Sequence, residues 1–254
     1  MAAPLIDAAI ENIRQLIASG ALRPGERLPS EGELSQQLGV SRSSTREAVR
    51  ALVSARVLDV RRGDGTFVTS LTPELLLEGI GVAVELMQED AVLQLVETRR
   101  VIEPQVTALA ATRADAGQLA EIHHHLTLMR AAKDYTELVT HDNDFHASVA
   151  RAAGNPTLAA ILIGISSPTL RTRVWRGLVD ADADRQTVAE HAAIYEAIAA
   201  HDPAMAAAAA LVHVGTTESW VRTVAAGADG LEAGEGGVPA PVGGPAAPRS
   251  AAAR

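Results

Sequence analysis

The chain has 254 residues, of which 47% are hydrophobic, and a formal net charge of −9 at pH 7. This length is enough to bury one large core or two ordinary ones, so we expect a soluble globular protein. The sequence has no run of about 18 uncharged apolar residues, and acidic residues occur too early in MAAPLIDAAIENIRQ for a signal-peptide core, so we predict a cytoplasmic protein with no membrane partner.

Three helices are predicted at the start of the chain. Residues 5–19 carry apolar side chains at helical spacing. The second helix follows Ser30, because Glu33 stands three residues later, the spacing of a capping box, and it ends at Gly39. The third helix, over about residues 42–54, places its alkyl groups on one face and its arginines on another.

A β-hairpin is predicted next, because VLDVRR and TFVTS flank a GDG turn in which glycine adopts positive φ at low cost. Three helices and a hairpin give the order of a winged helix-turn-helix, which we assign to residues 1–70. Residues 39–62 carry six arginines and two acidic residues, a local basic patch on an acidic protein. The third helix is therefore expected to enter the major groove of double-stranded DNA with its arginines outward.

The run GALRPGERLPSEGELSQQLGVSRSSTREAVRAL, with GDGTFV after it, resembles the DNA-binding domain of the GntR family of bacterial transcription regulators. The resemblance implies that Arg42 and Arg46 contact bases or phosphates and that Gly63 lets the wing approach the groove. Many members carry an arginine where this chain has Gly32, so that contact is either missing or supplied elsewhere.

Other candidate contacts come from the residues themselves. Ser41 and Ser43 offer short contacts to phosphate, and Arg61 and Arg62 stand at the tip of the wing. The predicted DNA-binding set is Ser41, Arg42, Ser43, Arg46, Arg50, Arg62 and Gly63.

A second, all-helical domain is predicted over residues 75–224, after a polar linker at 70–74. The fold class is therefore mainly α: a winged helix-turn-helix followed by a helical bundle. Residues 225–254 are rich in Gly, Pro and Ala, so we expect a disordered tail. The predicted helices of the bundle cover 75–88, 91–113, 115–130, 134–153, 156–176, 182–200 and 203–224.

Four polar residues are expected to face the interior of this bundle. Asp142 and His146 are four residues apart on an apolar helix face, and His191 and His213 lie on the apolar faces of two later helices. Burial of so many polar groups without a partner would cost several kcal/mol, and a divalent cation would account for all four. The absence of cysteine excludes thiolate ligands, so the candidates are Zn first, then Ni, Mn and Fe.

The same residues resemble a motif of the FCD effector domain in the FadR-type branch of the GntR family, in the form DNDFH, EHAAIYEAI and LVHVG. That resemblance implies the ligand set Asp142, His146, His191 and His213. The tract His123–His125 competes for a metal role, but consecutive residues fan around a helix, so we interpret it as surface.

Arg99 is the candidate effector-binding residue, since in similar proteins an arginine here borders the effector cavity and can pair with a carboxylate. An ion pair with Glu103, four residues later, is the alternative. Arg171 and Arg173 are further candidates for the cavity.

The sequence as a whole predicts a homodimeric transcriptional regulator that binds a palindromic operator and responds to a small carboxylate in a metal-containing helical pocket. Repression is the expected sign, and no catalytic residues are expected. Two alternatives stay open: a metal-dependent enzyme with a DNA-binding appendage, for which three histidines and an aspartate could activate water, and a regulator whose metal is purely structural.

Overall fold

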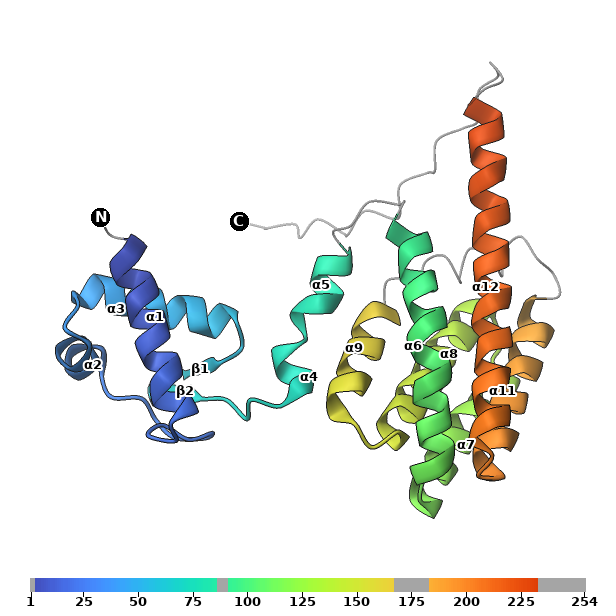
Figure 1. Cartoon of the computed structure of the whole chain (residues 1–254), viewed down its shortest axis with the longest axis horizontal. Coiled ribbons are helices and arrows are strands. Elements are labelled where there is room, and N and C mark those ends of the chain that lie inside the picture. Colours follow the sequence, from blue (N-terminus) through green and yellow to red (C-terminus); the bar gives the residue numbers. More distant parts are fainter. Residues whose placement is uncertain (1–2, 86–90, 167–182, 233–254) are drawn as a thin grey trace, which may run out of the picture.

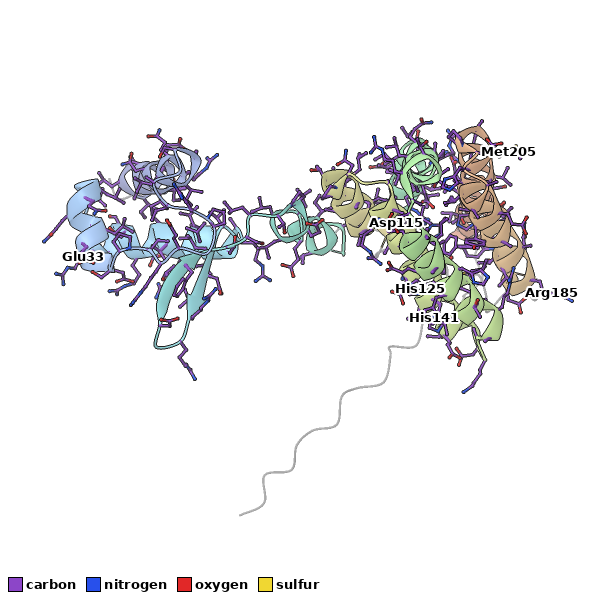
Figure 2. All side chains as sticks on the ribbon, turned by 90° about the horizontal axis from the view of Figure 1, so that it is seen from below. Glu33, Asp115, His125, His141, Arg185 and Met205 are labelled. Carbon is purple, nitrogen blue, oxygen red and sulfur yellow. The ribbon has the colours of Figure 1, made fainter. Side chains whose placement is uncertain are left out.

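The computed structural model describes residues 3–85, 91–166 and 183–232. Figure 1 shows a winged helix at one end, a bundle of helices at the other, and the short helices α4 (Pro73–Leu76) and α5 (Gly79–Glu85) between them. Figure 2 draws the side chains of all three parts, with Glu33 in the winged helix and Asp115 and Met205 in the bundle. The predicted fold class is confirmed.

Three helices build the winged helix: α1 (Ala3–Ala18), α2 (Glu31–Leu38) and α3 (Arg42–Ser54). Helix α3 occupies the predicted range, and α1 is shifted slightly towards the N-terminus. Their apolar faces meet in a core that also includes residues of the hairpin. This core consists of Ala9, Ile13, Leu28, Leu34, Ala48, Val49, Leu52, Leu58 and Val68.

Local hydrogen bonds fix the turn between α2 and α3. Ser30 Oγ accepts from the backbone N–H of Glu33, and Glu33 Oε2 accepts from that of Ser30, which confirms the predicted capping box. Gly39 ends α2 with φ 67°. Ser41 then caps α3, since its hydroxyl accepts from the backbone N–H of Ser44 at 3.1 Å.

The wing is an antiparallel pair of strands, β1 (Leu58–Arg61) and β2 (Gly65–Val68). Its turn closes through a hydrogen bond from the N–H of Asp64 to the carbonyl of Arg61, and Gly63 has φ 80°. The positive φ is the reason that the turn needs glycine there. The register pairs Leu58 with Val68, Asp59 with Phe67, Val60 with Thr66 and Arg61 with Gly65.

The connection between the domains differs from the prediction. Instead of one helix over 75–88, the described residues form α4 and α5, and residues 86–90 lie outside the described part of the chain. Pro73 takes the first position of α4, where its missing N–H is not needed. Both short helices contact α9 (Pro156–Ser166), so the linker packs on the bundle.

The bundle contains only helices in the described residues that follow Val68. Phe145 and Ile194 are among the residues fully buried at its centre. Its longer helices match the predicted ranges to within one or two residues at most ends. Besides α9, they are α6 (Ala91–Arg113), α7 (Ala116–Ala131), α8 (Tyr135–Ala152), α11 (Ala183–Ala199) and α12 (Pro203–Glu232).

Helix α12 continues to Glu232, so the predicted helix end at residue 224 was too early, and a disordered tail stays a prediction. Alanine-rich sequence propagates an existing helix readily, even where no core is available. The predicted helix over 156–176 corresponds to α9, and its residues after Ser166 lie outside the described part.

Candidate metal centre and nucleic-acid interface

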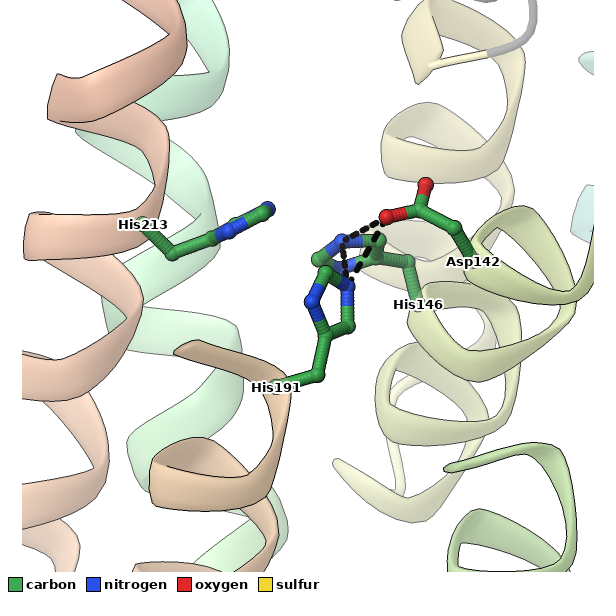
Figure 3. A group of neighbouring side chains, drawn as sticks. All are labelled: Asp142, His146, His191 and His213. Atoms are coloured by element: carbon green, nitrogen blue, oxygen red, sulfur yellow. Dashed lines mark hydrogen bonds and ion pairs between the residues drawn. The ribbon is translucent and has the colours of Figure 1, made fainter. Parts of the chain in front are cut away.

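The structure brings the four predicted metal ligands together. Asp142 and His146 project from α8, His191 from α11 and His213 from α12 (Figure 3). One nitrogen or oxygen of each side chain lies within 4.8 Å of those of the others. All four residues are buried, with exposed fractions between 0% and 6%. The side chains that helical spacing predicted to face the interior do meet there, from three different helices.

The closest contacts in this cluster lie between ring nitrogens and the carboxylate. Asp142 Oδ1 lies 2.9 Å from His191 Nε2 and 3.8 Å from His146 Nε2. The two Nε2 atoms of His146 and His191 are 3.1 Å apart. Buried nitrogen and oxygen atoms that face one another in this way form a donor set suited to a divalent cation.

The opposite ring nitrogen of each histidine has its own acceptor. The Nδ1 of His146 lies 2.7 Å from Glu103 Oε1, and that of His191 lies 2.7 Å from the carbonyl oxygen of Thr187. The Nδ1 of His213 lies 2.9 Å from Glu190 Oε2. An Nδ1–H that donates to a fixed acceptor leaves the Nε2 lone pair available for a metal, which is the usual outer shell of a metal-bound histidine.

Sequence reasoning did not assign these three acceptors. The carbonyl of Thr187 lies one helical turn before His191 and could have been inferred from that spacing. The sequence shows Glu190 only as the residue before His191, and it shows Glu103 only as a possible partner of Arg99. The contacts of these two carboxylates with histidines join different helices, so sequence spacing does not reveal them.

The electrostatics favour a neutral imidazole at His213 and an ionised carboxylate at Glu103. Burial lowers the pKa of His213 well below its usual value, and the neighbouring His191 and His146 lower it further. Burial alone would raise the pKa of Glu103, yet Arg99 and His146 hold it well below its usual range. His213 Nε2 is buried without a hydrogen-bond partner in the described residues, as expected of an atom placed to bind a cation. The residues present thus fit a divalent metal.

Arg99 forms the ion pair that was the alternative to an effector contact. Its Nη2 and Nε lie 2.9 Å and 3.0 Å from Glu103 Oε2, and both side chains are buried. One carboxylate therefore joins Arg99 to His146. A contact between Arg99 and an effector stays a prediction, and Arg171 and Arg173 lie outside the described residues.

The tract His123–His125 behaves as surface. His123 and His124 are exposed and His125 is half-buried, and none belongs to a group of metal-ligating side chains in the described part of the chain.

The seven predicted DNA-binding residues are all exposed on α3, on its cap or on the wing. Arg46 pairs with Glu31 of α2, and Arg50 pairs with Glu47 within α3. The space beside Gly32 is occupied by the guanidinium of Arg42, whose Nη2 would lie 3.5 Å from a Cβ built there. A Cβ at position 32 would therefore be in ordinary van der Waals contact with the guanidinium of Arg42.

Comparison with known proteins decides the family. Residues 5–68 match "Bacterial regulatory proteins, gntR family" and residues 94–216 match the FCD domain. The chain is 32% identical to the HTH-type transcriptional regulator LutR of Bacillus subtilis over 80% of this chain and 94% of LutR. The chain belongs to the GntR family of transcriptional regulators and carries an FCD domain.

Two further similarities agree with this assignment. The galactonate operon transcriptional repressor of Escherichia coli is 30% identical over 83% of this chain and 94% of its own length. The solved structure described as Streptococcus agalactiae GntR superposes with a TM-score of 0.64 and 25% identity, over 84% of this chain and 99% of the other. These relatives are named as regulators, which favours regulation over the enzymatic alternative. No helix in the described part of this GntR regulator has the length and apolar character needed to cross a membrane.

The FCD domain of this regulator also has a cavity beside the cluster. It has a volume of about 200 Å³ and lies between α8 and α9. Arg99 is not among the described residues that line it. The lining residues are Asn143, Asp144, His146, Ala147, Leu162, Ile163 and Ser166.

Proposed function

We propose that the chain is a cytoplasmic, homodimeric repressor whose binding to a palindromic operator is modulated by a small carboxylate in the metal-containing cavity of the FCD domain. The observation that carries this proposal is the buried group of three histidines and one aspartate, each imidazole held at Nδ1, directly beside a cavity. A divalent cation held there, with Zn first and Ni, Mn or Fe as alternatives, would supply positive charge and an open coordination position to a carboxylate.

The size of the cavity supports a small effector. Ligand pockets for drug-sized molecules have volumes of about 300–1,000 Å³, and this cavity is smaller. His146 contributes a wall of the cavity and is also a candidate ligand, so an acid bound there would lie next to the cluster. Apolar side chains of α9, Leu162 and Ile163, form another wall and would contact the carbon skeleton of the effector.

The route from this cavity to the winged helix passes through α9. Its inner side lines the cavity, and it packs against α4 and α5, which lead to the wing. At the crossing, a Cβ on Gly164 of α9 would lie 3.2 Å from Cγ2 of Ile80 in α5. Helices this close transmit a displacement instead of absorbing it, so an occupant of the cavity would bias the placement of the winged helix.

Operator titration of the metal-loaded protein tests this function. Duplexes selected from a random library by the protein should lose affinity when a matching small carboxylate is added, and the loss should disappear after the metal is removed by chelation. Hydrolysis or oxidation of the carboxylate by the loaded protein would favour the enzymatic alternative. Operator affinity that depends on metal but on none of the acids tested would favour a structural metal.

A further inference from the structure

The recognition helix carries an ion pair that reaches outside the helix. Arg46 of α3 donates to Glu31 of α2 through Nε, 3.0 Å from Oε2 and 3.3 Å from Oε1, and through Nη2, 3.0 Å from Oε2. Two N–H groups of one planar guanidinium therefore face one carboxylate. Such a contact fixes both the position and the plane of the guanidinium.

The stability of the domain does not explain this pair. The side chains of Arg46 and Glu31 are 53% and 44% exposed, and exposed ion pairs contribute little to folding. The domain has its own apolar core, to which neither residue belongs. The pair instead determines where the cation of Arg46 stands on the exposed face of α3.

Glu31 is itself held in place by the backbone. It is the first residue of α2, directly after Ser30, whose hydroxyl and backbone N–H are both engaged with Glu33 in the capping box. A side chain that extends from a closed turn has fewer positions to occupy than one on a free loop. The capping box therefore fixes the backbone from which the carboxylate of Glu31 extends towards Arg46.

The two neighbouring arginines of α3 are placed differently. Arg50 pairs with Glu47 one turn away in the same helix, a contact that can move as one with α3. The guanidinium of Arg42 packs against Gly32. Among these three, Arg46 alone is tied by its ion pair to a second helix.

We infer that Glu31 is a positioning residue for operator selectivity: it holds the guanidinium of Arg46 in one orientation for a bidentate contact with a base edge, at the cost of repelling DNA in general. This inference rests on the proposed contact of α3 with the operator. A preoriented guanidinium discriminates between sequences because a bidentate contact requires correct geometry. An added carboxylate near phosphate weakens binding to every sequence alike.

The test compares full-length variants on two duplexes, one selected by the wild-type protein from a random-sequence library and one scrambled. In Glu31→Ala, the ratio of the two affinities should fall about tenfold, the order expected when one bidentate contact loses its geometry. Affinity for the scrambled duplex should stay equal or rise. Glu31→Gln keeps an oxygen that accepts from Arg46, so its ratio should lie between those of the wild type and Glu31→Ala.

Glu47→Ala is the matched control, since it removes the same charge from the same surface but leaves the pair between Glu31 and Arg46 intact. Its affinity ratio should stay within about twofold of the wild type, because a lost charge alone acts on all sequences. In an Arg46→Ala background, Glu31→Ala should no longer lower the ratio. Thermal unfolding of each variant confirms that the domain is folded.

Equal ratios for Glu31→Ala and Glu47→Ala would overturn the inference, as would an undiminished effect of Glu31→Ala when Arg46 is absent. Failure of the wild-type protein to enrich any sequence from the library is a different result, which would count against operator binding by this surface and not against Glu31 alone.

Discussion

The Nδ1 atom of His213, on α12, lies 2.9 Å from Oε2 of Glu190, on α11, and the other carboxylate oxygen of Glu190 accepts from the hydroxyl of Thr216 at 2.9 Å. One carboxylate therefore joins two neighbouring helices and orients a candidate metal ligand. Under the proposed function, this contact would make metal affinity dependent on the packing of α11 against α12.

Glu190→Gln should weaken metal binding by about 10–100-fold, the usual effect of losing an outer-shell carboxylate. The amide is a poorer acceptor for the Nδ1–H of His213 and carries no charge, so Nε2 becomes a less basic ligand. Competition with a fluorescent zinc chelator measures the affinity. Glu196→Gln, on an exposed position of the same helix, is the control. Equal affinity of the two variants would show that Glu190 does not orient the ligand.

His191→Ala should lower metal occupancy and the effector response while operator binding in the absence of effector persists. The side chain supplies one of four candidate ligand atoms, and the winged helix has a separate core that this change does not reach. Metal analysis of purified protein and operator titrations with and without effector check both parts. His124→Ala, on the surface, should behave as wild type. Wild-type protein that cannot be loaded with Zn, Ni or Mn would refute the metal site.

Arg99→Met should lower the free energy of unfolding by about 3–5 kcal/mol, because it leaves the carboxylate of Glu103 buried without its cation. Denaturant unfolding measures the loss. Arg100→Met provides a comparison on the same helix. Arg100 is 46% exposed in its ion pair with Glu218, and Glu218 keeps Arg222 as a second cation, so the loss should be less than about 1 kcal/mol. Similar losses for both variants would mean that Arg99 does not act through Glu103.

Gly164→Ala should reduce the change in operator affinity caused by the effector. The new methyl group would lie 3.2 Å from Cγ2 of Ile80, so the side chain of Ile80 must shift by a few tenths of an ångström and the contact between α5 and α9 changes. The effector used is the small carboxylate that raises the thermal stability of the wild-type protein most. Operator titrations with and without this acid measure the response. Adding Ile80→Ala should restore it by making room.

Gly79→Ala is the control for that experiment, because a Cβ at Gly79, at the start of α5, would meet nothing within 4 Å. Its response should equal that of the wild type. A normal response in Gly164→Ala would exclude the crossing of α5 and α9 from the route between effector and DNA.

Features that depend on local pattern could be predicted from the sequence. The range of α3, the capping box of Ser30 and Glu33, and the glycine turn of the wing all follow from short-range chemistry. The four candidate metal ligands could also be predicted from the sequence, because these polar side chains interrupt otherwise apolar helix faces. Three separate faces with such interruptions indicate a common centre.

The remaining features depend on tertiary contacts. The contacts of Glu103 with His146 and of Glu190 with His213 join different helices, so no spacing within one helix reveals them. The pair of Glu31 and Arg46 spans the turn between α2 and α3 and depends on the angle of that turn. Helix ends depend on a competition between helix propensity and packing, and composition alone does not predict which of the two prevails. The break between α4 and α5 and the extension of α12 to Glu232 are examples.

The two apolar cores, one in the winged helix and one in the bundle, share no residue. Substitutions in separate cores usually add without interacting, so the two halves of the molecule are free to diverge independently. Under the proposed function, changes on the outer face of α3 would alter the operator that is bound, and changes around α8 and α9 would alter the ligand. The crossing of Gly164 with Ile80 would then be the part that changes in either half must leave intact. Chimeric regulators built by exchanging the segment from α1 to β2 should therefore retain their response as long as that crossing is left intact.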